Sequence, residues 1–281
     1  MRPSSSSDHC RAQVRALDFD RYLATLFAPA DKRPHLFALY AFSAEIARVR
    51  DQVSAPMPGE IRLQWWRDAV EGLGRGEVEA NPVAAALLAT IERFDLPRQA
   101  FLDLIEARVF DLYDDPMPSL SDLEGYLGET ASALIRLATL ILAEGRDPGG
   151  AEAAGHAGVG YGLTGLLRAL PWHASRGQLY LPADVLGRHG VTRDDVVLAR
   201  GGPGVLSSLA DLRTEARRHL VRASELRLTV PSAVASAFLP GALAPDYLAL
   251  MDRPDYDPFR TAIDRPAWRK IATLWGAARR I

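Results

Sequence analysis

Apolar residues recur at steps of three and four positions through most of this chain. In the segment from Pro34 to Gln52, one helical face would carry Leu36, Leu39, Tyr40, Ser43, Ile46 and Ala47. This spacing is typical of an α-helix with one buried face, and no alternation of apolar and polar residues is long enough to predict a strand. The pattern therefore predicts an all-α protein.

Proline, glycine and clusters of polar residues divide this pattern into separate helices. A helix over 119–145 is expected to begin at a capping box of Ser121 and Glu124, and one over 151–170 to end near Pro171. Further helices are expected over 34–52, 60–73, 84–93, 95–115, 206–228, 234–251 and 258–279. Because neither a repeat nor a low-complexity linker separates them, we predict a single-domain helical bundle over 19–281, preceded by a flexible N-terminus over 1–18.

Composition excludes several classes of protein. Hydrophobic residues make up 48% of the 281 positions and the net charge is −2, which suits a packed core but not a nucleic-acid partner. Cys10 is the single cysteine, so we expect neither a disulfide framework nor a cysteine-based metal site. No uninterrupted apolar run approaches the roughly 18 residues of a membrane-spanning helix. We expect a location in the bacterial cytoplasm or at the cytoplasmic membrane face, or in the mitochondrial matrix of a eukaryote.

A stripe of small residues marks the helix over 151–170. Gly155, Gly158, Gly162, Gly165 and Ala169 follow one another at steps of three or four, so all five lie on one helical face. Each glycine lowers helix stability by roughly 1 kcal/mol relative to alanine, so four on one face need a structural reason. Two interpretations remain open: another helix packs very close to this face, or the face lines a cavity.

Three polar segments have the composition of functional sites. The charged residues from Glu45 to Asp51 suit either a site or a solvated helix face. Arg176, in the turn after the small-residue helix, carries a planar guanidinium that binds diphosphate well, although single arginines are also common on surfaces. The segment from Asp111 to Pro116 resembles an aspartate-rich magnesium motif, but also a helix end followed by a turn. The histidines show no zinc-ligand spacing with each other or with a carboxylate pair, so no metal site is predicted.

Several segments, in order, resemble the squalene/phytoene synthase family of head-to-head prenyltransferases. They are 21–42, 63–70 and 162–186, and the last of them resembles a signature of the family. The resemblance implies the all-α isoprenoid synthase fold. It also implies an activity in which Mg²⁺ ions, held by aspartates on two facing helices, bind the departing diphosphate of an allylic substrate.

This chain departs from the family at the residues that serve the metal. The first motif falls on Ala47, Arg48 and Asp51, where one carboxylate remains. The second motif falls on Ala169 and His173. The polar residues that the family carries one and two turns before this motif fall on Gly165 and Gly162. Because Mg²⁺ requires hard oxygen ligands, these positions predict neither metal nor cofactor. The matching residues that remain, with Arg48, are candidates for binding an anionic ligand: Tyr40, Arg48, Tyr126, Arg168, Arg176 and Tyr180. We expect Arg48, Arg168 and Arg176 to face Asp51 in one site.

One branch of the family, assembly factors for respiratory complex I and their bacterial relatives, shares these departures. The resemblance to it lies in 45–54, 167–182 and 189–196. It implies a non-catalytic protein that contacts complex I subunits or other assembly factors, with peripheral membrane contact and an isoprenoid or lipid as ligand. The alternative is an active farnesyl or geranylgeranyl diphosphate transferase in squalene or carotenoid synthesis. That enzyme would hold Mg²⁺ with a displaced acid set, Asp111, Asp114 and Asp115.

Overall fold

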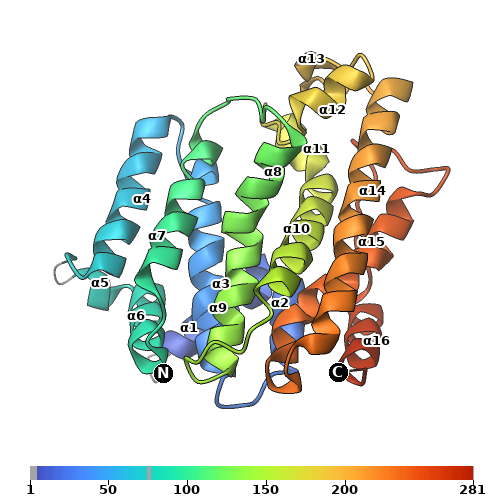
Figure 1. Ribbon diagram of the computed structural model, residues 1–281. Coiled ribbons are helices and arrows are strands. Elements are labelled where there is room, and N and C mark those ends of the chain that lie inside the picture. Colours follow the sequence, from blue (N-terminus) through green and yellow to red (C-terminus); the bar gives the residue numbers. More distant parts are fainter. Residues whose placement is uncertain (1–4, 75–76, 281) are drawn as a thin grey trace.

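The computed structural model describes residues 5–74 and 77–280, and the described residues form helices without a strand (Figure 1). The first half of the chain forms α1 (Ser6–Leu17), α2 (Phe19–Thr25), α3 (Arg33–Ala47), α4 (Pro56–Glu71), α5 (Glu77–Ala80), α6 (Pro82–Phe94) and α7 (Arg98–Ala107), with short 3₁₀ turns at Arg50–Gln52 and Phe110–Leu112. The predicted all-α class is confirmed.

The second half contains the two long helices that carry most of the candidate chemistry. It forms α8 (Leu120–Leu127), the π-helical segment η3 (Gly128–Ser132), α9 (Ala133–Leu142), α10 (Ala151–Arg168), α11 (Leu170–Ser175), α12 (Ala183–Arg188), α13 (Arg193–Val197), α14 (Pro203–Leu226), the 3₁₀ segments η4 (Arg227–Thr229) and η5 (Ser232–Leu243), α15 (Ala244–Met251) and α16 (Ala267–Ala278). Helix α10 packs along α14, and also against η3 and α9.

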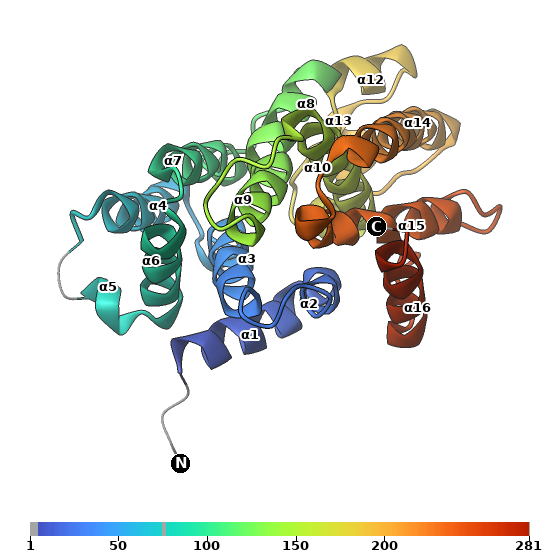
Figure 2. The ribbon, with the colours of Figure 1, turned by 60° about the horizontal axis from the view of Figure 1, so that its bottom comes forward.

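Helices α3, α9 and α10 occupy the middle of the bundle (Figure 2). Helices α4 to α7 lie on one side of them, and α14 to α16 lie on the other. The chain is built this way because the central helices are apolar around much of their circumference: α3 buries nine of its 15 residues, among them Leu39 and Phe42. Such helices need neighbours on several sides.

The expected helices exist, but several boundaries were wrong. The helix predicted over 34–52 ends at Ala47, and a separate 3₁₀ turn follows at 50–52. The stretch 119–145 is interrupted by the π-helical segment η3, and its N-cap is Ser119, whose hydroxyl accepts a hydrogen bond from the Asp122 amide, rather than Ser121. The helix predicted over 258–279 begins at Ala267. Local patterns locate helices better than their ends, because the ends depend on tertiary packing.

The N-terminal segment is also more ordered than expected. Residues 6–17 of the expected flexible stretch form α1, which packs against α3 and α6 and buries Cys10 and Val14 completely. This helix was not predicted because the segment is largely polar and the buried face of the helix is narrow. Residues 1–4 lie outside the described residues.

By length and composition alone, one helical stretch among the described residues is apolar enough to cross a membrane. It comprises η5 and α15, from Ser232 to Met251, with a mean hydropathy of 1.3. Two-thirds of this window (67%) is buried inside the protein. A buried core segment meets the same criteria, and the packing of η5 against α9, α10 and α16 is that of a core segment.

Candidate functional site

A central cavity of about 620 Å³ opens between α2, α3, η3, α10 and α16. Helix α3 contributes Ser43 and Ala47 to its wall, while α10 and its C-terminal end contribute Gly162, Gly165 and Ala169. Ala47 of the first degenerate motif and the residues of the second therefore border one cavity. His173 of α11 also lines this cavity, and burial lowers the pKa of its imidazole to about 4.

Both interpretations of the small-residue stripe hold, each for a different part of it. A Cβ atom on Gly158 would lie 2.3 Å from the Cα atom of Ser132, so α10 and η3 approach backbone to backbone there. At Gly162 the Cβ atom would meet the side chain of Leu127 at 2.7 Å. Gly165, by contrast, has nothing within 4 Å and borders the cavity. The stripe packs closely at Gly158 and Gly162 and borders the cavity toward its C-terminal end, whereas Gly155 at its N-terminal end has nothing within 4 Å of an added Cβ atom.

A buried ionic network occupies one wall of the cavity and centres on Asp20 of α2. Its carboxylate accepts hydrogen bonds from Lys270 Nζ at 2.8 Å, from Arg168 Nη1 at 3.0 Å and from the Tyr247 hydroxyl at 2.8 Å. Burial alone would raise the pKa of Asp20, but the bond from Lys270 and the charge of Arg168 hold it below its ordinary value. Asp264 adds a second carboxylate, 2.6 Å from Lys270 Nζ. The two cations are therefore already neutralised by protein groups.

Two further arginines on the cavity wall are also paired. Arg21 donates to Asp18 at 2.7 Å, and its guanidinium carbon lies 5.5 Å from the ring centroid of Tyr40 and 5.2 Å from that of Tyr161. Such cation–π contacts hold a buried guanidinium in place. Desolvation raises the pKa of the Tyr40 phenol to about 12, so this ring remains neutral.

Arg108 is the second of these arginines and belongs to a cluster with two tyrosines. It lies 3.0 Å from Asp111, which also accepts hydrogen bonds from the hydroxyls of Tyr126 at 2.7 Å and Tyr180 at 3.0 Å. Arg108 and Tyr126 line the cavity, whereas Asp111 is buried behind them with 5% exposure. The Nε atom of Arg108 is buried without a hydrogen-bond partner among the described residues.

The structure corrects the expectation that Arg48, Arg168 and Arg176 face Asp51 in one site. Only Arg168 lines the central cavity. Arg48 caps the C-terminus of α3 and is exposed beside Glu45 on another face. Arg176 and Asp51 form an ion pair of 2.8 Å that lines a separate small pocket. The chain turns from α-helix to 3₁₀ geometry after Ala47, and this turn carries Arg48 and Asp51 away from the cavity.

Six charged residues of the cavity were not predicted from the sequence: Asp18, Asp20, Arg21, Arg108, Asp264 and Lys270. None of them lies in a degenerate motif. A weak signal existed for Lys270, because it is one of only two lysines in a chain whose other basic residues are arginines. Nothing in the local pattern around Asp20 distinguishes it from a surface carboxylate.

The residues present do not fit the magnesium site that the fold family implies. Ala47, Gly165 and Ala169 offer no side-chain oxygen, and the acids that border the cavity, Asp18, Asp20 and Asp264, are ion-paired with basic side chains. Mg²⁺ would have to displace those cations to gain oxygen ligands.

The displaced acid set of the alternative does not assemble at the cavity either. Asp111 is enclosed by its own partners, and neither Asp114 nor Asp115 lines the cavity; both are exposed. Asp114 lies 3.5 Å from Arg50, in an ion pair on the surface. Among the described residues, these three acids therefore present no joint set of oxygen ligands to the cavity.

Comparison with known proteins places this geometry in context. The chain is 34% identical over 257 residues to NADH dehydrogenase (ubiquinone) complex I, assembly factor 6, of Rattus norvegicus, covering 92% of this chain and 77% of the relative. It is 25% identical to presqualene diphosphate synthase of Sinorhizobium fredii, covering 89% and 88%.

Among solved structures, a dehydrosqualene synthase in complex with ligand has a TM-score of 0.83 at 18% identity and covers 98% of this chain and 96% of its own. This likeness confirms the fold. The family model for squalene/phytoene synthase matches residues 14–272. The cavity between facing degenerate motifs, the fold and this match together show that the chain belongs to the squalene/phytoene synthase family.

Proposed function

We propose that this protein is a non-catalytic member of its family that assists the assembly of respiratory complex I. The observation that carries the proposal is the neutralised cavity wall. Asp18 pairs with Arg21 at 2.7 Å, and Asp20 and Asp264 pair with Lys270 at 2.8 and 2.6 Å. Carboxylates held in this way are poor ligands for Mg²⁺. Relatives named for complex I assembly, at 34% identity over most of the chain, support the assembly role.

The cavity itself suits binding better than turnover. Its volume of about 620 Å³ falls in the range of small-molecule sites, and its wall includes the apolar side chains of Leu127, Leu134 and Leu166. Arg108, on the cavity wall, provides a guanidinium for a polar head group. We propose an isoprenoid or lipid as the ligand, with its apolar chain against the leucines and its head group near Arg108.

A turnover assay tests the non-catalytic part of the proposal. Purified full-length protein is incubated with farnesyl diphosphate and Mg²⁺, and pyrophosphate and prenyl products are measured, with the Sinorhizobium fredii presqualene diphosphate synthase as positive control. We expect no release above that of a sample containing a chelator. Product formation that is lost in Arg168→Ala, on the cavity wall, but kept in Arg176→Ala, outside it, would refute the proposal. Circular dichroism of both variants checks that they fold.

Deletion of the gene in the source organism tests the assembly role. We expect less assembled complex I on native gels and lower NADH:ubiquinone activity, with squalene-derived lipids and carotenoids unchanged. Both defects should disappear when the intact gene is returned.

The alternative, an active prenyltransferase, draws its support from the 25% identity to presqualene diphosphate synthase. It predicts the reverse result on deletion: altered isoprenoid lipids with normal complex I.

A native mass spectrum after mild extraction tests the ligand. We expect a bound mass of isoprenoid or lipid size that is lost when Gly165→Leu fills the cavity. Leucine is chosen because nothing lies within 4 Å of a Cβ atom at this position. Protein that carries no such mass when isolated from its own host would count against the binding role.

A further inference from the structure

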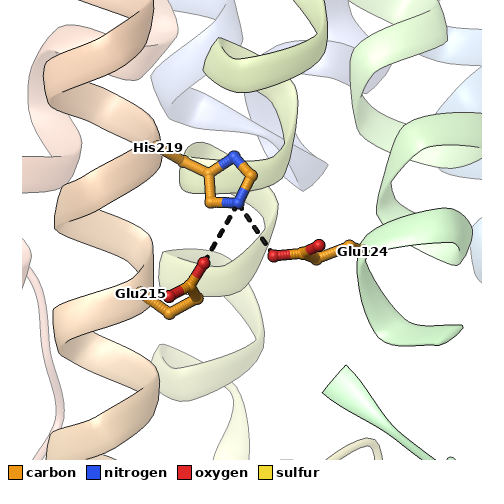
Figure 3. A group of neighbouring side chains, drawn as sticks. All are labelled: Glu124, Glu215 and His219. Atoms are coloured by element: carbon orange, nitrogen blue, oxygen red, sulfur yellow. Dashed lines mark hydrogen bonds and ion pairs between the residues drawn. The ribbon is translucent and has the colours of Figure 1, made fainter. Parts of the chain in front are cut away.

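A cluster of metal-ligating side chains lies outside the central cavity, between α8 and α14 (Figure 3). Glu215 and His219 are one turn apart on α14, so both project from the same face toward Glu124 of α8. The Nε2 atom of His219 lies 2.9 Å from Glu124 Oε1 and 3.4 Å from Glu215 Oε1. The three ligand atoms all lie within 4.8 Å of one another.

The protein's own hydrogen bonds leave one conflict in this cluster: Arg218 pairs with Glu215 and, at 3.4 Å, with Glu124, but its Nη2 atom also faces the imidazole of His219. His219 is buried, with 5% exposure, while Arg218 Nη2 lies 3.0 Å from the same Nε2 atom that contacts Glu124. An arginine N–H can only donate, and a carboxylate can only accept. The Nε2 atom therefore cannot serve both contacts. With a proton it faces another donor, Arg218, and without a proton it faces another acceptor, Glu124.

A second histidine from α10 sets up the ring for metal binding. The Nδ1 atoms of His156 and His219 are 2.9 Å apart, so one of them donates to the other. When His219 donates from Nδ1 to a neutral His156, its Nε2 lone pair is directed at the two carboxylates. This is the tautomer of a metal ligand whose other nitrogen is held by a hydrogen bond.

We propose that Glu124, Glu215 and His219 bind a divalent transition-metal ion, such as Zn²⁺, that clamps α8 to α14. Zinc bonds of about 2.0–2.2 Å hold the ligand atoms of a tetrahedral ion about 3.3–3.6 Å apart, which matches the 3.4 Å to Glu215 and requires the 2.9 Å to Glu124 to widen by about half an ångström. An imidazole nitrogen among the ligands favours a transition metal over Mg²⁺ or Ca²⁺. Two carboxylates against one arginine leave a net negative charge for the cation. A water molecule would complete a four-coordinate ion.

Access from solvent to the cluster, and its separation from the central cavity, support this assignment. His156 and Arg218 line a surface depression on α14, which gives a route from solvent to the cluster. Arg218 is 56% exposed in its side chain and can turn into solvent when a cation takes its place. None of the three ligands borders the central cavity, so the site depends neither on the proposed function nor on the family's magnesium motifs.

The sequence predicted no metal site, although Glu215 and His219 have the i, i+4 spacing that places two side chains on one helical face. The third ligand, Glu124, is 95 positions away from His219 and reaches the cluster only because α8 and α14 both pack against α10.

Isothermal titration of the chelator-treated full-length protein with ZnCl₂ tests the proposal, with MgCl₂ as the comparison. We expect one tight zinc site per chain and no comparable heat with magnesium. Glu124→Gln and Glu215→Gln should each weaken zinc binding by at least about tenfold. Arg218→Ala should tighten it about fivefold, because a competing cation of surface ion-pair strength is removed.

Matched controls separate this site from adventitious binding. Glu225→Gln changes a more exposed carboxylate on the same helix, and Asp211→Asn alters a histidine–carboxylate pair, His189–Asp211, at the same 2.9 Å spacing. Both variants should bind zinc like the wild type. The proposal is overturned if zinc does not bind, if Glu124→Gln and Glu215→Gln bind as the controls do, or if Arg218→Ala weakens binding, which would indicate an ordinary ion-pair network. X-ray absorption should show a nitrogen and oxygen shell without sulfur.

Discussion

The close approach of α10 and η3 at Gly158 leads to a sharp stability prediction. In Gly158→Ala, the new methyl group would lie 2.3 Å from Ser132 Cα and 2.4 Å from Ser132 N. These are backbone atoms, so no side-chain rotation relieves the overlap. The helices must separate, which also strains the 2.7 Å hydrogen bond that the Ser132 hydroxyl donates to the Gly155 carbonyl. Gly165 on the same stripe is the matched control, because nothing lies within 4 Å of its added methyl group.

The magnitude follows from two opposing effects. Overpacking a dense site lowers stability by about 1–3 kcal/mol, and a backbone obstacle places Gly158 near the upper end. Replacing a helical glycine by alanine raises stability by about 1 kcal/mol. Gly158→Ala should therefore lower the free energy of unfolding by about 2 kcal/mol. Gly165→Ala, which gains the helix effect alone, should raise it by about 0.5–1 kcal/mol.

Chemical denaturation followed by circular dichroism measures both variants, and calorimetry adds the midpoint temperature. The destabilisation of Gly158→Ala corresponds to a decrease of about 4–8 °C for a chain of this size. The reasoning is refuted if Gly158→Ala is as stable as the wild type. A loss of more than about 1 kcal/mol in Gly165→Ala would show that this end of the stripe is packed rather than open.

Three further predictions concern buried titratable groups. Asp20→Asn should destabilise the protein by about 3 kcal/mol, since it removes a buried partner of Lys270, whereas the exposed Asp31→Asn should leave stability nearly unchanged; thermal melts compare the two. His173 has a folded pKa of about 4, below its unfolded value of about 6.5, so the unfolded state takes up the proton first and stability decreases as pH falls from 6.5 toward 4. His173→Gln should flatten that decrease in melts at pH 7 and pH 5. Cys10 is fully buried, and burial raises its thiol pKa to about 11, so a thiol reagent should label it rapidly only in denaturant; fast labelling of native protein would contradict the packing of α1.

The sequence alone was sufficient for the class of fold and the family. Amphipathic spacing predicted helices at nearly all the longer elements, and the resemblance placed Ala47, Gly165 and Ala169 on facing walls, where the structure has them. It failed at Arg48, because a helix that ends at Ala47 and one that continues to Gln52 have the same local pattern. The end of that helix is decided by what packs beyond it.

What the sequence determined by itself is local: helices form because each backbone hydrogen bond joins residues a few positions apart, and because apolar faces repeat with the helical period. What only the tertiary structure decided is which charges meet. Asp20 and Lys270 are separated by 250 positions, and Glu124 and His219 by 95. No local pattern relates such residues, because their interaction exists only after helices far apart in the chain have packed together. The neutralised cavity wall and the proposed metal clamp are therefore properties of the fold.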